Sequence, residues 1–137
     1  MAETERLACC ACGALTAMAR GEPGSVVMCS CTMCQRRSGS AFALSSYWDA
    51  DKVTIDGPST AFERPTDAGR IFTHNFCPTC GTALWYFGSH RPGMIGISAG
   101  CFTDPDFPLP RAAVWDATRH KWLDKINDIP RLEKQRT

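Results

Sequence analysis

The sequence predicts a mainly β protein with short helical turns, and three observations support this fold class. Short apolar stretches recur at close spacing along most of the chain. Turn-forming residues interrupt them throughout, because the chain contains 11 glycines and 9 prolines. No stretch shows the sustained apolar periodicity of a long amphipathic helix, so many short strands are the better interpretation.

In the first half of the chain, turn residues bound the predicted strands. Gly21 and Gly24 separate the first two strands, and Gly57 with Pro58 separates the last two. A helical turn is expected at residues 32–38, directly after a group of three cysteines. The predicted strands are 15–20, 25–29, 41–47, 52–55 and 61–63.

In the second half, the same pattern continues with breaks at Gly69, Gly88, Gly93 and Gly100. A further helical turn is expected near residues 123–129, before a polar C-terminal tail. The predicted strands are 70–76, 83–87, 94–99 and 112–115.

Length and charge limit the classes of function. A chain of 137 residues suits a single domain over residues 1–137. Fifteen basic and 14 acidic residues leave a net charge of +1, which does not favour a nucleic-acid partner. No apolar run approaches the ~18 residues of a membrane span, and the acidic N-terminus does not resemble a signal peptide. We therefore expect a cytoplasmic protein that acts on small molecules, with oligomerisation left open.

Nine cysteines are the outstanding feature of the composition. An odd number of cysteines, most of them in tight clusters, is typical of metal ligands or catalytic thiols in a reducing compartment rather than of disulfides.

Two of the clusters predict one structural zinc site. In the stretch CPTCG, Cys77 and Cys80 can face one ion because Pro78 favours the turn between them and Gly81 lets the chain close under the metal. A structural zinc site needs four ligands, and the stretch CACG supplies Cys10 and Cys12. We predict that these residues form a four-cysteine cluster; the alternative is two unrelated pairs of buried thiols.

The remaining cluster has three cysteines, Cys29, Cys31 and Cys34, and no neighbouring fourth ligand. Three protein ligands with one open position are typical of a catalytic zinc. Three thiolates and Zn²⁺ carry a net charge of about −1, so such a site polarises a carbonyl poorly but can deprotonate an incoming thiol. The following Arg36 and Arg37 are candidates for binding the carboxylates of a peptide-like thiol.

Other interpretations of this three-cysteine cluster stay open. A remote residue would close the site and make it structural, and the candidates are Cys9, Cys101, His74 and His90. The two arginines are equally compatible with ordinary surface charges. A zinc deaminase is excluded, because none of the three histidines begins the His-x-Glu motif of that chemistry.

Taken in order, these motifs resemble the glutathione-dependent formaldehyde-activating enzyme family, which also includes centromere protein V. The resemblance rests on C-x-C-G near the N-terminus, C-x-C-x-x-C before basic residues and Ser-Gly-Ser, and F-C-x-x-C-G, and it extends over about residues 7–130. It implies antiparallel zinc-binding sheets of the β-tent type, a structural zinc on the four-cysteine cluster and a catalytic zinc on the three-cysteine cluster. The implied activity is a carbon–sulfur lyase that joins glutathione to formaldehyde, as an S-(hydroxymethyl)glutathione synthase does.

Three functions therefore compete. The first is this thiol-activating enzyme, with formaldehyde or another small electrophile as the second substrate. The second is a non-catalytic domain with two structural zincs that mediates protein interaction, although the chain lacks the basic extensions typical of that role. The third is a redox or metal sensor that uses Cys9 and Cys101, the two cysteines outside the predicted ligand sets.

Overall fold

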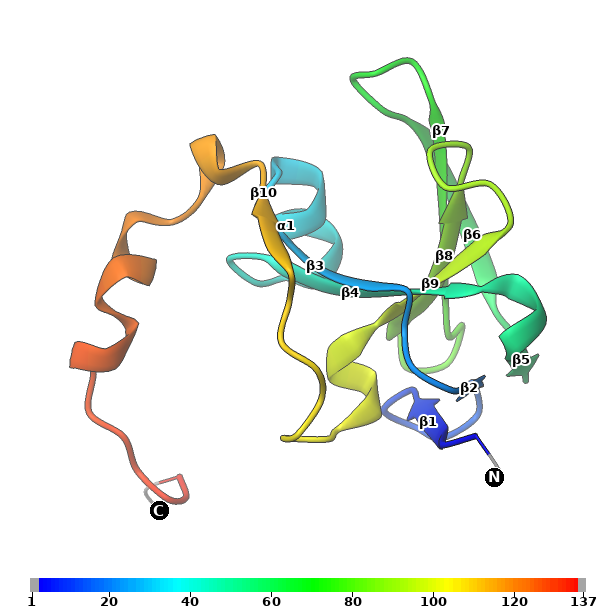
Figure 1. Cartoon of the computed structure of the whole chain (residues 1–137), viewed down its shortest axis with the longest axis horizontal. Coiled ribbons are helices and arrows are strands. Elements are labelled where there is room, and N and C mark those ends of the chain that lie inside the picture. The colour runs from blue at the N-terminus through cyan, green and yellow to red at the C-terminus, as the bar shows by residue number, and fades with distance from the viewer. Residues whose placement is uncertain (1–2, 136–137) are drawn as a thin grey trace.

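A computed structural model describes residues 3–135, and within them the chain forms a small and a large β-sheet (Figure 1). The small sheet has the strand order β1-β2-β5, and its strands are β1 (Glu5–Cys9), β2 (Thr16–Arg20) and β5 (Val53–Asp56). The large sheet has the order β10-β3-β4-β9-β8-β7-β6. Its strands are β3 (Ser25–Cys29), β4 (Ala43–Asp49), β6 (Thr60–Pro65), β7 (Ile71–Phe76), β8 (Ala83–Gly88), β9 (Met94–Ser98) and β10 (Ala112–Val114).

The described helices are short. One α-helix, α1 (Thr32–Ser38), follows β3 and is closed by Gly39 in the left-handed conformation, with φ of 65°. The other helical elements are the 3₁₀ turns η1 (Ala50–Lys52), η2 (Ala99–Phe102), η3 (Asp116–Thr118) and η4 (Lys121–Asp128).

The main core lies between the two sheets. In β2, Ala17 and Ala19 are completely buried and alternate with less buried residues, which gives this strand one core-facing side. Trp48 from β4 is 1% exposed, and its indole N–H donates to the Ser46 hydroxyl at 3.0 Å, so its polar atom is satisfied inside the core. The buried members of this core are Ala8, Cys10, Leu15, Ala17, Ala19, Trp48, Cys77, Leu84, Ile97 and Phe102.

A second, smaller core consists of the rings of Tyr47, Phe72 and Tyr86 on the large sheet. Gly96 of β9 makes this ring packing possible, because a Cβ at that position would lie 2.2 Å from the Tyr86 ring and 3.1 Å from the Tyr47 ring. Two of these rings, Tyr47 and Phe72, matter for function because they line the cavity described below.

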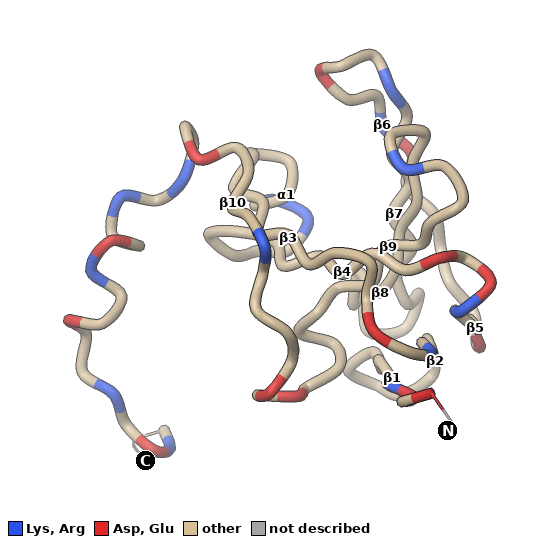
Figure 2. The backbone as a smooth tube through the Cα atoms, in the orientation of Figure 1, with Lys and Arg blue, Asp and Glu red and all other residues tan. Residues whose placement is uncertain are grey.

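The C-terminal part of the chain packs loosely against the rest. Strand β10 pairs with β3, and beyond it the orange and red segment of Figure 1 runs away from both sheets. Trp115, Trp122 and Ile129 of this segment are 53%, 47% and 52% exposed. Basic and acidic residues alternate along it in Figure 2.

The predicted fold class is confirmed, with corrections to two strands. The sequence missed β1, because ERLAC has only one fully buried residue, Ala8, and so lacks a clear apolar alternation. Strand β10 runs parallel to β3, whereas the family resemblance implied antiparallel sheets. In the described residues, no helix is both long and apolar enough to span a bilayer.

Candidate functional site

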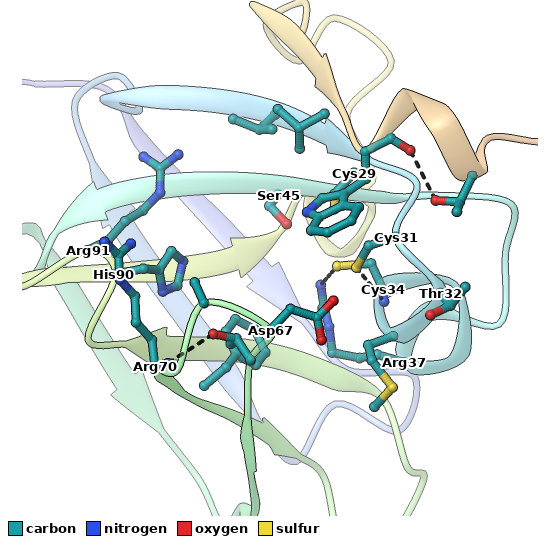
Figure 3. Close-up of a pocket in the computed structure, with 18 of the residues that line it drawn as sticks. Cys29, Cys31, Thr32, Cys34, Arg37, Ser45, Asp67, Arg70, His90 and Arg91 are labelled. Atoms are coloured by element: carbon teal, nitrogen blue, oxygen red, sulfur yellow. Dashed lines mark hydrogen bonds between the residues drawn. The ribbon is translucent and has the colours of Figure 1, made fainter.

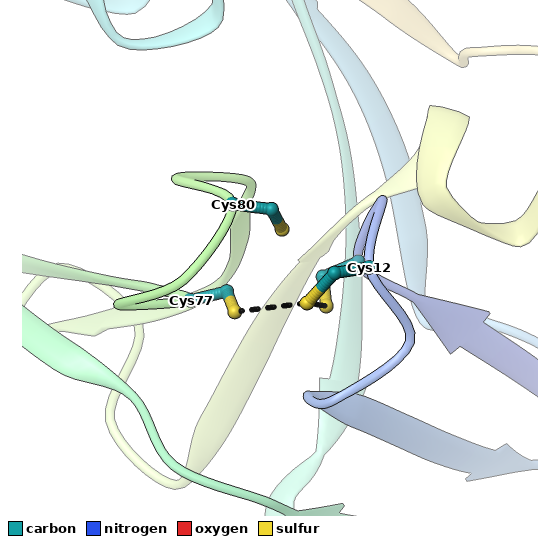
Figure 4. Close-up of side chains that lie close together, drawn as sticks. Cys12, Cys77 and Cys80 are labelled. Atoms are coloured by element: carbon teal, nitrogen blue, oxygen red, sulfur yellow. Dashed lines mark hydrogen bonds between the residues drawn. The ribbon is translucent and has the colours of Figure 1, made fainter.

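The four-cysteine cluster lies where the two sheets meet. The sulfur atoms of Cys10, Cys12, Cys77 and Cys80 all lie within 4.8 Å of one another, with Sγ–Sγ distances of 3.7 Å for Cys10–Cys12 and 3.6 Å for Cys12–Cys77. Figure 4 shows Cys77 and Cys80 from the β7–β8 turn facing Cys12 from the β1–β2 turn. The cluster is positioned to hold one metal ion and to link the small sheet to the large one.

Each turn of this cluster is closed by a glycine with a positive φ. In the β7–β8 turn, the amide of Gly81 donates to the Cys77 carbonyl at 2.8 Å, with a φ of 78° that favours glycine. In the β1–β2 turn, Gly13 donates to the Cys10 carbonyl at 3.1 Å with a φ of 85°. The Leu15 amide also donates to the Cys10 sulfur at 3.2 Å, which stabilises negative charge on that ligand.

The three-cysteine cluster lies at the junction of β3 and α1. Cys29 ends the strand, Cys31 is the N-cap of the helix, and Cys34 is in its first turn. The Cys34 amide donates to the Cys31 sulfur at 3.2 Å, so the helix start fixes the spacing of these two ligands. The three sulfurs lie within 4.8 Å of one another and are positioned to hold a second metal ion.

No fourth His, Cys, Asp or Glu atom in residues 3–135 joins this cluster within the same distance. The sequence offered Cys9, Cys101, His74 and His90 as remote ligands, and none of them belongs to either cluster.

The pKa values of two neighbouring thiols in the three-cysteine cluster are shifted in opposite directions. The hydrogen bond from Cys29 is the main cause that lowers the pKa of Cys34 to about 5, and the positive charge of Arg37 also lowers it. The same hydrogen bond and burial raise the pKa of Cys29. A divalent metal that favours sulfur ligands, such as Zn²⁺, would stabilise the thiolate forms of these cysteines.

A cavity of about 550 Å³ opens onto the three-cysteine cluster, and all three of its cysteines line it (Figure 3). Cys29, Cys31 and Cys34 lie at one end of the view, whereas Arg70, His90 and Arg91 lie at the other. The remaining walls come from the β6–β7 hairpin, the rings of Tyr47 and Phe72 and the segment around β10. The volume is in the range of pockets that bind small molecules.

The lining of this cavity is strongly basic. Asp67 is its only acidic residue, and none of its arginines forms a salt bridge within the part of the chain described here. The arginines that line it are Arg37, Arg64, Arg70, Arg91 and Arg111. A cavity with this charge favours an anionic ligand.

The structure separates the two arginines that the sequence grouped together. Arg37 lines the cavity, its Nη2 lies 3.7 Å from the Cys34 sulfur, and its guanidinium stacks on the Tyr86 ring at 4.3 Å. Arg36 instead lines a separate hollow with His120 and does not line the cavity. Only Arg37 is therefore placed to contact a ligand beside the three-cysteine cluster.

Sequence reasoning missed the other cavity arginines, and it favoured a core position for Trp115, which is 53% exposed and lies at the cavity rim. Trp115 lines the cavity with a φ of 55°, which is unusual for a residue with a large side chain. The Gln35 amide donates to the carbonyls of Ser30 and Thr118, so α1 holds this C-terminal segment near the three-cysteine cluster. The positive φ of Trp115 could not be predicted from the sequence, because tryptophan rarely adopts one.

Comparison with known proteins places the chain in a family. The family model described as "Glutathione-dependent formaldehyde-activating enzyme" matches residues 5–118. The chain belongs to this family. The resemblance inferred from the cysteine spacing is thereby confirmed, and the relation to centromere protein V stays a prediction.

Two similar proteins agree with this assignment. A Halomonas elongata protein named "Putative glutathione-dependent formaldehyde-activating enzyme" is 27% identical over 131 residues, which cover 92% of this chain and 80% of the relative. A crystal structure of a Rhodobacter sphaeroides protein matches with a TM-score of 0.57 and 20% identity, over 78% of this chain and 98% of the other. At this identity, the likeness to the Rhodobacter sphaeroides structure supports the fold of this chain and says nothing about its activity.

Proposed function

We propose that this protein activates the thiol of glutathione, or of a similar molecule, at the three-cysteine cluster and adds it to formaldehyde or another small electrophile. The observation that carries the proposal is the position of this cluster in the wall of a basic cavity, with three sulfur ligands and no fourth in the described chain. The family match to residues 5–118 supports the same chemistry.

The proposed reaction is an addition that needs no redox partner. The thiol loses its proton, its sulfur forms a bond to the carbonyl carbon, and the electron pair of the carbonyl bond moves to oxygen. The oxygen takes a proton from water or a pocket hydroxyl, and the product from formaldehyde is S-(hydroxymethyl)glutathione. This assigns the protein to the carbon–sulfur lyases, with Cys29, Cys31 and Cys34 as the metal ligands. A zinc ion bound there would supply the positive charge that lowers the pKa of the incoming thiol.

Residues of the chain supply the surroundings for this step. Arg37 is fixed between the Cys34 sulfur and the Tyr86 ring, where its charge favours an anionic thiol. A second zinc on the four-cysteine cluster would be structural, since all four positions are filled by protein. We place the activity in a reducing compartment such as the cytoplasm, because all nine cysteines are free thiols.

The test is the rate of S-(hydroxymethyl)glutathione formation, measured by exchange NMR against the uncatalysed reaction. Thiols add to formaldehyde without a catalyst, so the zinc-loaded protein must accelerate the exchange above buffer. We expect Cys31→Ser to abolish the acceleration and Cys101→Ser, the matched control outside both clusters, to keep it. Equal rates for the wild-type protein and Cys31→Ser would refute the proposal and favour the non-catalytic zinc domain.

A further inference from the structure

Besides Arg37, the cavity contains a second group of charged residues. Arg64, Arg70, His90 and Arg91 all line the cavity, and the guanidinium groups of Arg64 and Arg37 both lie over the Phe72 ring, at 5.0 Å and 5.5 Å from its centre. Figure 3 shows Arg70, His90 and Arg91 together, on the opposite side of the cavity from Cys29, Cys31 and Cys34. Figure 2 likewise shows basic positions on the β6–β7 hairpin and on the neighbouring loop. We call Arg64, Arg70, His90 and Arg91 the distal cluster.

Strand register explains why two of these arginines share one wall. Arg64 of β6 pairs directly with Phe72 of β7. Arg70 lies two residues before Phe72, and side chains two apart on an extended chain point to the same face of a sheet. The hairpin tip between them is closed by hydrogen bonds between Thr66 and Arg70, at 2.7 Å for the Thr66 amide and 3.1 Å for its hydroxyl. Both guanidinium groups are therefore directed to the cavity by regular backbone geometry.

Aromatic rings hold two of the guanidinium groups in place. The Arg91 guanidinium carbon lies 3.9 Å from the centre of the Tyr47 ring, and that of Arg64 lies 5.0 Å from the centre of the Phe72 ring. Arg91 also donates to the Ser25 hydroxyl at 3.1 Å. Stacking occupies the flat face of a guanidinium and leaves N–H groups at its edge, which are the groups that bind a carboxylate.

The positive charge of the distal cluster is not neutralised by the protein. No salt bridge involves its arginines in the described residues, although Asp67 lies in the same hairpin tip. Burial is the main cause that lowers the pKa of His90, and the charges of Arg91, Arg70 and Arg64 lower it further. The buried Nδ1 of His90 also has no hydrogen-bond partner. The cluster is thus a positively charged wall with donors directed at the cavity and no internal anion to receive them.

We infer that the distal cluster is a carboxylate-binding subsite, which receives the acidic end of the thiol substrate while its sulfur lies at the three-cysteine cluster. This inference rests on the proposed function for the place of the sulfur. It adds that the protein selects thiols carrying a carboxylate several bonds away from sulfur, as both carboxylates of glutathione are. Neutral thiols of the same length are poor ligands.

The position of the subsite favours the thiol over the electrophile as the source of this carboxylate. A carbonyl carbon that bonds to sulfur must lie beside the three-cysteine cluster, so the carboxylate of a small acid such as glyoxylate would stay near Arg37. Arg70, His90 and Arg91 lie on the opposite side of the cavity from the cysteines (Figure 3), so a ligand that contacts both groups must extend across it. The peptide arms of glutathione have this property.

The experiment uses S-methylglutathione, which keeps both carboxylates but has no free thiol to activate. Its affinity for the purified full-length protein is measured by calorimetry and compared with that of its diester, in which both carboxylates are neutralised. We expect the diester to bind at least about tenfold more weakly, since charge-assisted hydrogen bonds to guanidinium groups are lost. Because binding of this thioether requires no thiol activation, the result is independent of whether the addition reaction occurs.

Substitutions of single arginines test which residues bind the carboxylates of S-methylglutathione. Arg70 is exposed in the hairpin, so we expect Arg70→Gln to fold normally. This substitution should weaken S-methylglutathione binding by about threefold to tenfold. Arg91→Gln is expected to have a larger effect, because Arg91 is fixed by Tyr47 and Ser25. Arg131→Gln, in the exposed C-terminal segment, is the matched control and should bind as the wild-type protein does.

Three outcomes would overturn the inference. These are no binding of S-methylglutathione to the wild-type protein, equal binding of the diester, or an unchanged affinity in both Arg70→Gln and Arg91→Gln. In a further experiment, glyoxylate alone is titrated into the wild-type protein and into Arg70→Gln. If glyoxylate binds and Arg70→Gln abolishes that binding, the subsite binds the carboxylate of the electrophile. The inference that it binds the carboxylate of the thiol substrate would then be wrong.

Discussion

The two cysteine clusters share one type of ligand atom but lie in opposite surroundings. The four-cysteine cluster joins two tight turns from different sheets, and its Cys77 is fully buried. The three-cysteine cluster belongs to one continuous strand–helix segment and lines a cavity. The first arrangement fills every position of a tetrahedral metal, whereas the second leaves room for a ligand from outside.

From this difference we propose that the first cluster contributes to stability and the second to chemistry. A metal that bridges residues 10–12 and 77–80 closes a long loop, so its binding energy is part of the folding energy. The cysteines at residues 29–34 are close in sequence and are already positioned by α1, so their metal adds little to the fold. The nearby guanidinium of Arg37 instead suits the binding of an anionic thiol.

The largest expected effect comes from breaking the four-cysteine cluster. Cys77→Ser removes one of four ligands at a site that is 0% exposed between the sheets. We expect it to lower the free energy of unfolding by about 4 kcal/mol or more, because a structural metal is lost. Circular dichroism during thermal unfolding, together with zinc content, measures this. A variant that unfolds at the wild-type temperature would contradict the structural role.

Breaking the three-cysteine cluster should have a much smaller effect on stability. In Cys31→Ser the new hydroxyl can still cap α1, because serine is a favoured N-cap residue and the Cys31 side chain already accepts the Cys34 amide. We expect a loss of about 1–2 kcal/mol of stability and of one zinc per chain. Unfolding as severe as that of Cys77→Ser would show that both clusters are structural.

The two neighbouring arginines give a sharper comparison within the proposed site. Arg37→Gln should weaken glutathione binding by about tenfold, since it removes a charge held 3.7 Å from the Cys34 sulfur. Arg36→Gln should leave the affinity within about twofold, because its side chain lies outside the cavity. Calorimetric titration of both variants measures the ratio. Equal losses would mean that net charge rather than position decides binding.

The smallest effect is expected at a cysteine outside both clusters. Burial raises the pKa of Cys101 to about 11, so its thiol stays protonated at pH 7.5 and reacts slowly, since the thiolate is the nucleophile. We expect Cys101→Ser to keep the wild-type zinc content and to change stability by only about 1 kcal/mol. Rapid alkylation of Cys101 by iodoacetamide at pH 7.5, followed by mass spectrometry, would instead support the redox-sensor hypothesis.

The cysteine clusters could be predicted from sequence because ligand spacing is a local property. Cys77 and Cys80, or Cys31 and Cys34, are held together by a single turn whatever the rest of the fold does. The sequence could also have shown which of Arg36 and Arg37 lies beside the three-cysteine cluster. Arg37 is three residues after Cys34 on a helix and therefore shares its face, whereas Arg36 does not.

The cavity could not be predicted, because it depends on tertiary pairing. Arg64, Arg70 and Arg91 are isolated in sequence, and no local pattern marks them. They meet because the β6–β7 hairpin and the loop between β8 and β9 line the same cavity as β3 and α1, although these elements are far apart in the sequence. The parallel pairing of β10 with β3, which brings Trp115 to the rim, is likewise a long-range contact.

The most direct test of the contrast between the clusters is a zinc count combined with glutathione titration, before and after mild chelation. We predict two zinc ions per chain, of which a chelator removes one without unfolding the protein, and glutathione binding that disappears with that ion and returns when zinc is restored. Two ions that resist the chelator equally, with no glutathione binding in either state, would contradict the account and show that both sites are closed.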